Sequence, residues 1–150
     1  MNNADQASST YDQPENFWLG IKQFNQREYY ACHDTLEAIW MDAQSFNRGF
    51  YQGILQIAVG LYHLSNLNWK GAAILLGEGI HRLDAYADSY GGIDVAALVN
   101  QAVDWLNALQ ELGPSQVQSL ASILSTQPQT SGEPVAPCLQ TLKVPEIHMG

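Results

Sequence analysis

Positively charged residues are scarce in this sequence, and their scarcity argues against one class of function. The 150 residues include six Lys and Arg against fifteen Asp and Glu, which gives a formal net charge of −9. The six cations are scattered along the chain and form no cluster. Because nucleic acids are polyanions that proteins bind through basic surfaces, we expect no nucleic-acid partner. An acidic surface favours solubility and is compatible with cation binding.

Cysteines and long apolar runs are also few. The two cysteines, Cys32 and Cys138, lie far apart, whereas small secreted domains usually carry more cysteines, paired in disulfides. The most apolar stretch, residues 50–64, is shorter than a membrane span and is interrupted by two glutamines and a histidine. The first sixteen residues are polar and acidic, unlike a signal peptide. These absences predict a cytoplasmic protein without a membrane partner.

The sequence does contain helical periodicity, divided by turn and capping residues. No strand-like alternation of any length appears. The segment 46–64 is apolar almost all round, which is typical of a helix covered on every side. We therefore predict an all-α fold, a compact helical bundle of about five to six helices around this central apolar helix. The first expected helix begins near Pro14, and the next two span 28–43 and 46–64. The fourth begins at Asn66 or Asn68 and ends at Gly91-Gly92, with Ala87 pointing inward. The last two run from Asp94 to Gly113-Pro114 and from Ser115 to Leu124.

Composition divides the chain into three parts. We expect a polar N-terminal segment over 1–13, a helical bundle domain over 14–124, and a tail rich in Pro, Ser and Gln over 125–150. Within the tail, Cys138 to Val144 alternates slightly. This pattern fits either an extended segment lying along the bundle or a disordered end.

A histidine and a glutamate on the second expected helix are the first candidates for chemistry. His33 and Glu37 are four residues apart, so their side chains leave the helix on adjacent turns of one face. Leu36 and Trp40 lie on the same face, which predicts that it points into the core. A buried carboxylate is costly unless it is paired or bound to a cation, so Glu37 requires a partner.

The central helix supplies partners on one of its faces. Gly53, Gln56, Gly60 and His63 follow one another at helical spacing, and the two glycines permit close approach of another backbone. A short connection near 44–47 makes this helix the neighbour of 28–43. We therefore expect Gln56 and His63 to face the His33 and Glu37 pair.

Three interpretations of this constellation stay open. The first is a structural polar network without a ligand. The second is a metal site in which His33, Glu37 and His63 hold a divalent ion such as Zn²⁺, with Glu37 as third ligand or as the catalytic base on a bound water. The third is a small-molecule pocket in which Trp40 and the tyrosines form apolar walls and His or Glu orients the ligand, with Trp40 and Gln56 as the ligand-binding residues. Whether copies of the chain assemble into a homo-oligomer is also left open.

The same residues resemble a known family. Several segments match the pattern of one family: Tyr30-Ala-Cys-His-Asp-Thr-Leu-Glu-Ala-Ile-Trp40, then Gly53-Ile-Leu-Gln56, His63 and Gly71-Ala72. In these segments the chain resembles the domain-of-unknown-function 309 family. The family's pattern of His, three residues, Glu, two residues and Trp is matched by His33, Glu37 and Trp40. The resemblance covers about Phe24 to Leu83.

The resemblance implies a small cytoplasmic helical bundle whose activity is not established. Some classifications of relatives suggest a metal-dependent hydrolase on the basis of the His and Glu pattern. By resemblance, His33, Glu37, Trp40, Gln56 and His63 are the site positions. Ala31 is a departure, because many relatives carry an acidic residue there; if that residue helps to hold a cation, this chain holds it less tightly.

Overall fold

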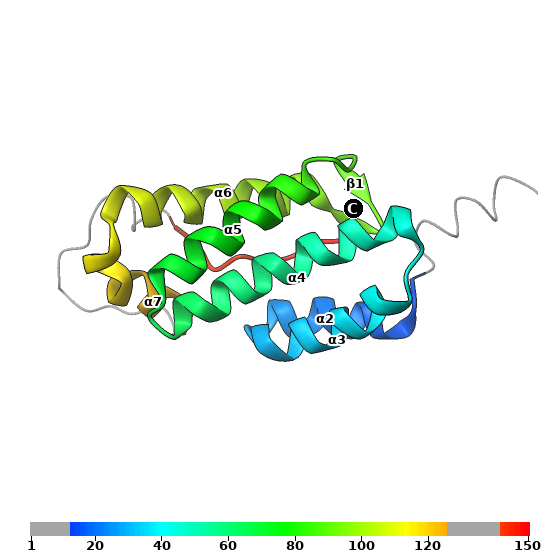
Figure 1. Ribbon diagram of the computed structural model, residues 1–150, viewed down its shortest axis with the longest axis horizontal. Coiled ribbons are helices and arrows are strands. Elements are labelled where there is room, and N and C mark those ends of the chain that lie inside the picture. The colour runs from blue at the N-terminus through cyan, green and yellow to red at the C-terminus, as the bar shows by residue number, and fades with distance from the viewer. Residues whose placement is uncertain (1–12, 126–141) are drawn as a thin grey trace, which may run out of the picture.

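The computed structural model describes residues 13–125 and 142–150 and shows a bundle of α-helices. Most of the expected N-terminal segment and residues 126–141 of the expected tail, Cys138 included, lie outside the described residues. The described part contains six α-helices, a short 3₁₀ helix and two very short strands (Figure 1), which confirms the all-α prediction. The α-helices are α2 (Glu15–Asn25), α3 (Tyr29–Asp42), α4 (Ser45–Ser65), α5 (Trp69–Leu83), α6 (Val95–Leu112) and α7 (Val117–Ser125).

Helix α4 is the centre of the bundle, as its apolar sequence predicts. In Figure 1 it runs between α2 and α3 on one side and α5 and α6 on the other. Its buried residues include Phe50, Ile54, Ile57 and Leu61, each 0% exposed. These four share one face, but Tyr51 and Ala58 to one side of it and Gln56 and Gly60 to the other are buried as well, so α4 needs neighbours on more than one face.

Capping residues begin two of the helices where the sequence predicts them. The Asn68 side-chain oxygen accepts a hydrogen bond from the Gly71 N–H at 2.9 Å, which starts α5. The Asp94 carboxylate accepts one from the Ala97 N–H at 2.9 Å, which starts α6. Each bond satisfies a backbone donor that the first turn of a helix leaves without an intrahelical acceptor.

The segment after α5 departs from the prediction. Helix α5 ends at Leu83 instead of continuing to Gly91-Gly92, and Ala87, expected to point inward, is exposed. The segment instead forms an antiparallel hairpin of β1 (Ser89–Tyr90) and β2 (Ile93–Asp94). Gly91 and Gly92 form its two-residue turn with φ of 63° and 88°, a conformation that glycine adopts without strain. Two strands of two residues are too short to produce a visible alternation in the sequence.

The beginning of the last helix also differs in detail. Ser115, expected as its cap, lies within the 3₁₀ helix Pro114–Gln116, and α7 begins directly afterwards at Val117. Gly113, with φ of 78°, ends α6 and allows this change of direction.

The chain end, residues 142–150, lies along the bundle in extended form (red in Figure 1). The Trp105 indole N–H donates to the Lys143 carbonyl at 2.7 Å. The Asn25 side chain donates to the Ile147 carbonyl at 2.9 Å and accepts from the Ile147 N–H at 2.7 Å. Ile147 itself is 3% exposed, so hydrogen bonds and apolar packing both fix this segment.

Within the described ranges, no helix combines the length and the hydropathy that crossing a lipid bilayer requires.

Candidate functional site

Helix α3 is rotated relative to the orientation that the sequence predicts. Its buried residues are Tyr29, Cys32 and Leu36, which recur at helical spacing and face the core. The side chains of His33 and Glu37 are 21% and 50% exposed. The prediction that Glu37 lies in a water-poor interior is therefore wrong. Hydration of the carboxylate at the surface avoids the desolvation penalty that burial would impose.

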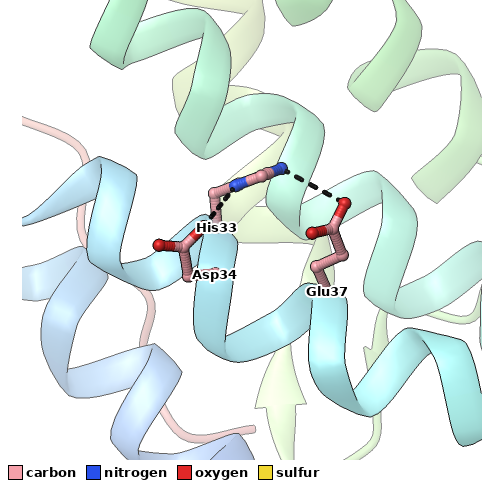
Figure 2. Close-up of side chains that lie close together, drawn as sticks. All are labelled: His33, Asp34 and Glu37. Atoms are coloured by element: carbon pink, nitrogen blue, oxygen red, sulfur yellow. Dashed lines mark hydrogen bonds and ion pairs between the residues drawn. The ribbon is translucent and has the colours of Figure 1, made fainter.

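His33 lies between two carboxylates on the outer face of α3 (Figure 2). Its Nδ1 is 3.2 Å from the Asp34 Oδ1 atom, within hydrogen-bonding distance. Its Nε2 is 3.7 Å from the Glu37 Oε2 atom, one helical turn away. One donor atom from each of the three side chains falls within 4.8 Å of the others, which makes them a candidate metal-binding group. In the described residues no other group of three or more His, Cys, Asp or Glu meets this criterion.

His63 does not belong to this group, so the expected His33, Glu37 and His63 triad is not assembled. Its Nδ1 instead lies 3.3 Å from the Asn68 Nδ2 atom, near the C-terminal end of α4. Helix α4 does pack against α3, but not through the predicted face.

The predicted face of α4 packs against α5. Gln56 is 8% exposed and is hydrogen-bonded to two side chains of α5: it donates to the Glu78 carboxylate at 3.3 Å and accepts from the Arg82 Nε at 3.1 Å. A Cβ atom at Gly53 would lie 2.6 Å from the Leu83 Cγ, and one at Gly60 would lie 3.1 Å from the Leu76 backbone nitrogen. The glycines thus permit a close helix approach, as predicted, but the approaching helix is α5. The prediction that Gln56 faces His33 and Glu37 is wrong for the same reason.

Trp40 is partly buried and forms a cation–π contact with a neighbouring helix. The Arg48 guanidinium carbon lies 4.3 Å from the centroid of the Trp40 ring. The Trp40 indole N–H is buried and has no hydrogen-bond partner within the described part of the chain. Trp40 therefore connects the end of α3 to the start of α4, and its predicted role in ligand binding stays a prediction.

Two residues near His33, Asp34 and Tyr30, join the site positions expected from the sequence. Asp34 follows His33 directly. Adjacent helical residues point about 100° apart, so the spacing does not predict the contact that the Asp34 carboxylate makes with the imidazole. Tyr30, one turn before His33, is 52% exposed, and its ring lies 5.6 Å from the His33 ring and 5.0 Å from the Tyr62 ring of α4. Its i, i+3 spacing from His33 is a signal available in the sequence.

The donor set suits a divalent transition-metal ion. A metal bonded to an imidazole nitrogen and a carboxylate oxygen at about 2.1 Å each, with tetrahedral angles, separates those two atoms by about 3.4 Å. The observed 3.7 Å between the His33 and Glu37 atoms is close to this value. A carboxylate on the other imidazole nitrogen, as Asp34 provides, holds the ring in a fixed orientation. Two direct ligands leave the remaining coordination positions to solvent or to a bound molecule.

Comparison with known proteins finds a family to which part of the chain is similar. Residues 17–75 match the sequence model of a family described as a domain of unknown function (DUF309), which confirms the resemblance; the match begins seven residues before Phe24 and ends eight residues before Leu83. A 60-residue stretch, 39% of this chain, is 37% identical to the uncharacterized protein YpuF of Bacillus subtilis (strain 168). The matched stretch spans about a third of that relative's length, 34%. No solved structure matches the chain. Both comparisons leave the function unknown.

Proposed function

We propose that this protein binds a divalent transition-metal ion on the exposed face of α3, through His33 and Glu37, as a binding protein and not as a hydrolase. The observation that carries the proposal is the placement of His33 between Asp34 and Glu37, with an Nε2 to Oε2 distance of 3.7 Å. His and carboxylate donors at i, i+4 on one helix need little rearrangement to share an ion.

Non-catalytic binding is favoured because the hydrolase alternative requires a third protein ligand. Catalytic zinc sites commonly use three protein ligands and one water in an enclosed site. His63, the expected third ligand, lies outside the group, and Glu37 is half exposed to solvent.

A reducing, cytoplasmic location is part of the same proposal. Cys32 is a free, fully buried thiol in the core, where it acts as a small apolar side chain. The net charge of −9 supports a cation as ligand and argues against a nucleic-acid partner.

Isothermal titration of tag-free protein with Zn²⁺ tests the proposal. We expect one ion per chain, with binding weakened at least about tenfold by His33→Ala and by Glu37→Gln. Asp34→Asn, which retains the side-chain shape and removes the charge, should weaken binding by about tenfold through its effect on the imidazole. Asp34 and Glu37 are exposed and His33 is partly exposed, which limits the effect of these substitutions on folding.

Two matched histidine variants serve as controls. His81→Ala removes an exposed histidine of α5, and His63→Ala removes the ligand that the hydrolase alternative needs. We expect both to bind Zn²⁺ like the wild type. If His63→Ala weakens binding as strongly as His33→Ala, the proposed pair is wrong and the three-ligand site is favoured.

A further inference from the structure

A second candidate site lies at the opposite end of α3 from Trp40. A groove of about 620 Å³ is bordered by the start of α3, the end of α4 and the end of α7. The first three residues of α3, Tyr29, Tyr30 and Ala31, all line it. The groove is open to solvent and does not include His33 or Glu37.

The start of α3 presents backbone donors at this groove. Glu28 is the N-cap residue, but its side chain makes no capping hydrogen bond, and the first turn contains no acidic residue. The first intrahelical bond runs from the Cys32 N–H to the Glu28 carbonyl, so the N–H groups of residues 29–31 have no acceptor within the described ranges. Free N–H groups and the positive end of the helix dipole favour a negatively charged group at this position.

An independent observation points to a ligand at the same place. Tyr29 is 4% exposed and lines the groove, yet its buried hydroxyl has no hydrogen-bond partner among the described residues. Burial raises the pKa of that hydroxyl above its ordinary value and outweighs the charge of Arg27, another lining residue, which lowers it. The hydroxyl therefore keeps its proton and offers a donor. A buried polar group without a partner is destabilising, so its retention suggests that a partner binds there.

The wall of the groove is aromatic. Tyr30 is 52% exposed, and its ring lies 5.0 Å from the Tyr62 ring at an angle of 43°. An exposed tyrosine ring beside a second one offers a surface for a planar apolar group. Glu28 also lines the groove and offsets the charge of Arg27, so the start of α3, rather than these two side chains, would select a negatively charged ligand.

We propose that this groove binds a small aromatic carboxylate, with the carboxylate at the start of α3 and the Tyr29 hydroxyl and the ring against Tyr30 and Tyr62. The proposal rests on different residues from the metal site and does not depend on it.

Amide NMR titrations with benzoate, in the presence of a chelator, test this proposal. We expect benzoate to shift the amide signals of residues 29–31 with a midpoint in the millimolar range. Benzamide, which keeps the ring but lacks the charge, should shift these signals much less at the same concentration. Acetate, which keeps the charge and lacks the ring, should bind more weakly than benzoate.

Variants separate the two halves of the proposed site. Tyr29→Phe should weaken benzoate binding about fivefold, the value of one hydrogen bond. Tyr86→Phe is the matched control, because the Tyr86 hydroxyl donates to the Phe46 carbonyl away from the groove, and it should leave binding unchanged. Tyr30→Ala, at an exposed position, should weaken benzoate binding and leave acetate binding unchanged.

Two results would overturn the proposal. One is an equal response to benzoate and benzamide at residues 29–31. The other is an unchanged benzoate midpoint in Tyr29→Phe together with an unchanged midpoint in Tyr30→Ala. Because the Tyr29 hydroxyl makes no hydrogen bond to any residue that the structure describes, Tyr29→Phe should unfold at or above the wild-type temperature, and its binding can be measured.

Discussion

Two glycines of α5 provide a stringent test of how closely α5 packs against α4. Gly79 and Gly77 lie on the same helix, two residues apart. A Cβ atom at Gly79 would lie 2.7 Å from the Ile57 Cγ1, 2.9 Å from the Gly53 carbonyl oxygen and 3.1 Å from the Ile57 backbone nitrogen. A Cβ atom at Gly77 would meet the Leu106 Cδ2 alone, at 3.9 Å, an ordinary van der Waals distance.

The magnitude follows from two opposing effects. Replacing glycine by alanine inside a helix stabilises the helix by about 1 kcal/mol at either position. At Gly79 this gain is opposed by overpacking, whose usual cost is about 1–3 kcal/mol. We expect the upper end of that range, because two of the three contacted atoms belong to the α4 backbone and cannot rotate away. Gly79→Ala should therefore lower the free energy of unfolding by about 2 kcal/mol, and Gly77→Ala should raise it by about 1 kcal/mol.

Urea denaturation followed by far-UV circular dichroism measures this difference directly. The two variants should differ by about 3 kcal/mol, or by roughly 6–12 °C in melting temperature. An unchanged m-value would show that the unfolded states are comparable. If Gly79→Ala is as stable as Gly77→Ala, the backbones of α4 and α5 do not approach each other as described, and the assignment of Gln56 to the α5 side loses its support.

Two further predictions concern the chain end and the core. Asn25→Ala removes both hydrogen bonds to the Ile147 backbone and should lower the free energy of unfolding, measured by urea denaturation, by about 2 kcal/mol. The control Gln26→Ala, at an exposed neighbouring position, should change this free energy by less than about 0.5 kcal/mol. Burial raises the pKa of the Cys32 thiol to about 12. The thiol of the unfolded chain therefore loses its proton at a lower pH than that of the folded chain, and the free energy of unfolding should fall as the pH rises from the ordinary thiol pKa toward 12.

The outcomes that would contradict these two predictions are specific. Equal stability of Asn25→Ala and Gln26→Ala would mean that the chain end is not fixed by Asn25. For the thiol, the wild type should lose about 1.4 kcal/mol per pH unit more than Cys32→Ala over this range. Parallel pH profiles of the two proteins would mean that the thiol is exposed to solvent.

The helices could be predicted because local signals define them. Asn68 and Asp94 satisfy first-turn backbone donors, and Gly113 ends α6 with a positive φ. These interactions span three or four residues, so sequence spacing suffices to find them. The apolar character of α4 likewise places it at the centre without knowledge of its neighbours.

The rotation of α3 could not be settled in this way. A stripe of His33, Leu36 and Trp40 and a stripe of Tyr29, Cys32 and Leu36 share a residue and are both consistent with helical spacing. The second stripe is buried because packing against α2 and α4 selects it. Cys32 is apolar and Glu37 is costly to bury, and both properties favour the orientation observed.

The partner of the glycine face on α4 was also beyond local reasoning. Close approach requires a partner helix, and both α3 and α5 neighbour α4 in sequence. Gln56 is hydrogen-bonded to Glu78 and Arg82, which lie 22 and 26 residues away in the sequence, so no spacing rule points to them. The same distance effect hides the contacts of the chain end, since Asn25 and Ile147 are 122 residues apart.

Following the imidazole nitrogen signals by NMR during a Zn²⁺ titration is the most direct test of the proposed metal site. The chain contains four histidines, and their imidazole ¹⁵N shifts report which of them binds the ion. We expect the His33 Nε2 signal to move at one equivalent, Glu37→Gln to suppress this change, and the His63 signal to stay in place. A His63 signal that moves together with that of His33, or a His33 signal that stays unchanged while Zn²⁺ binds, would rule out the proposed pair of ligands.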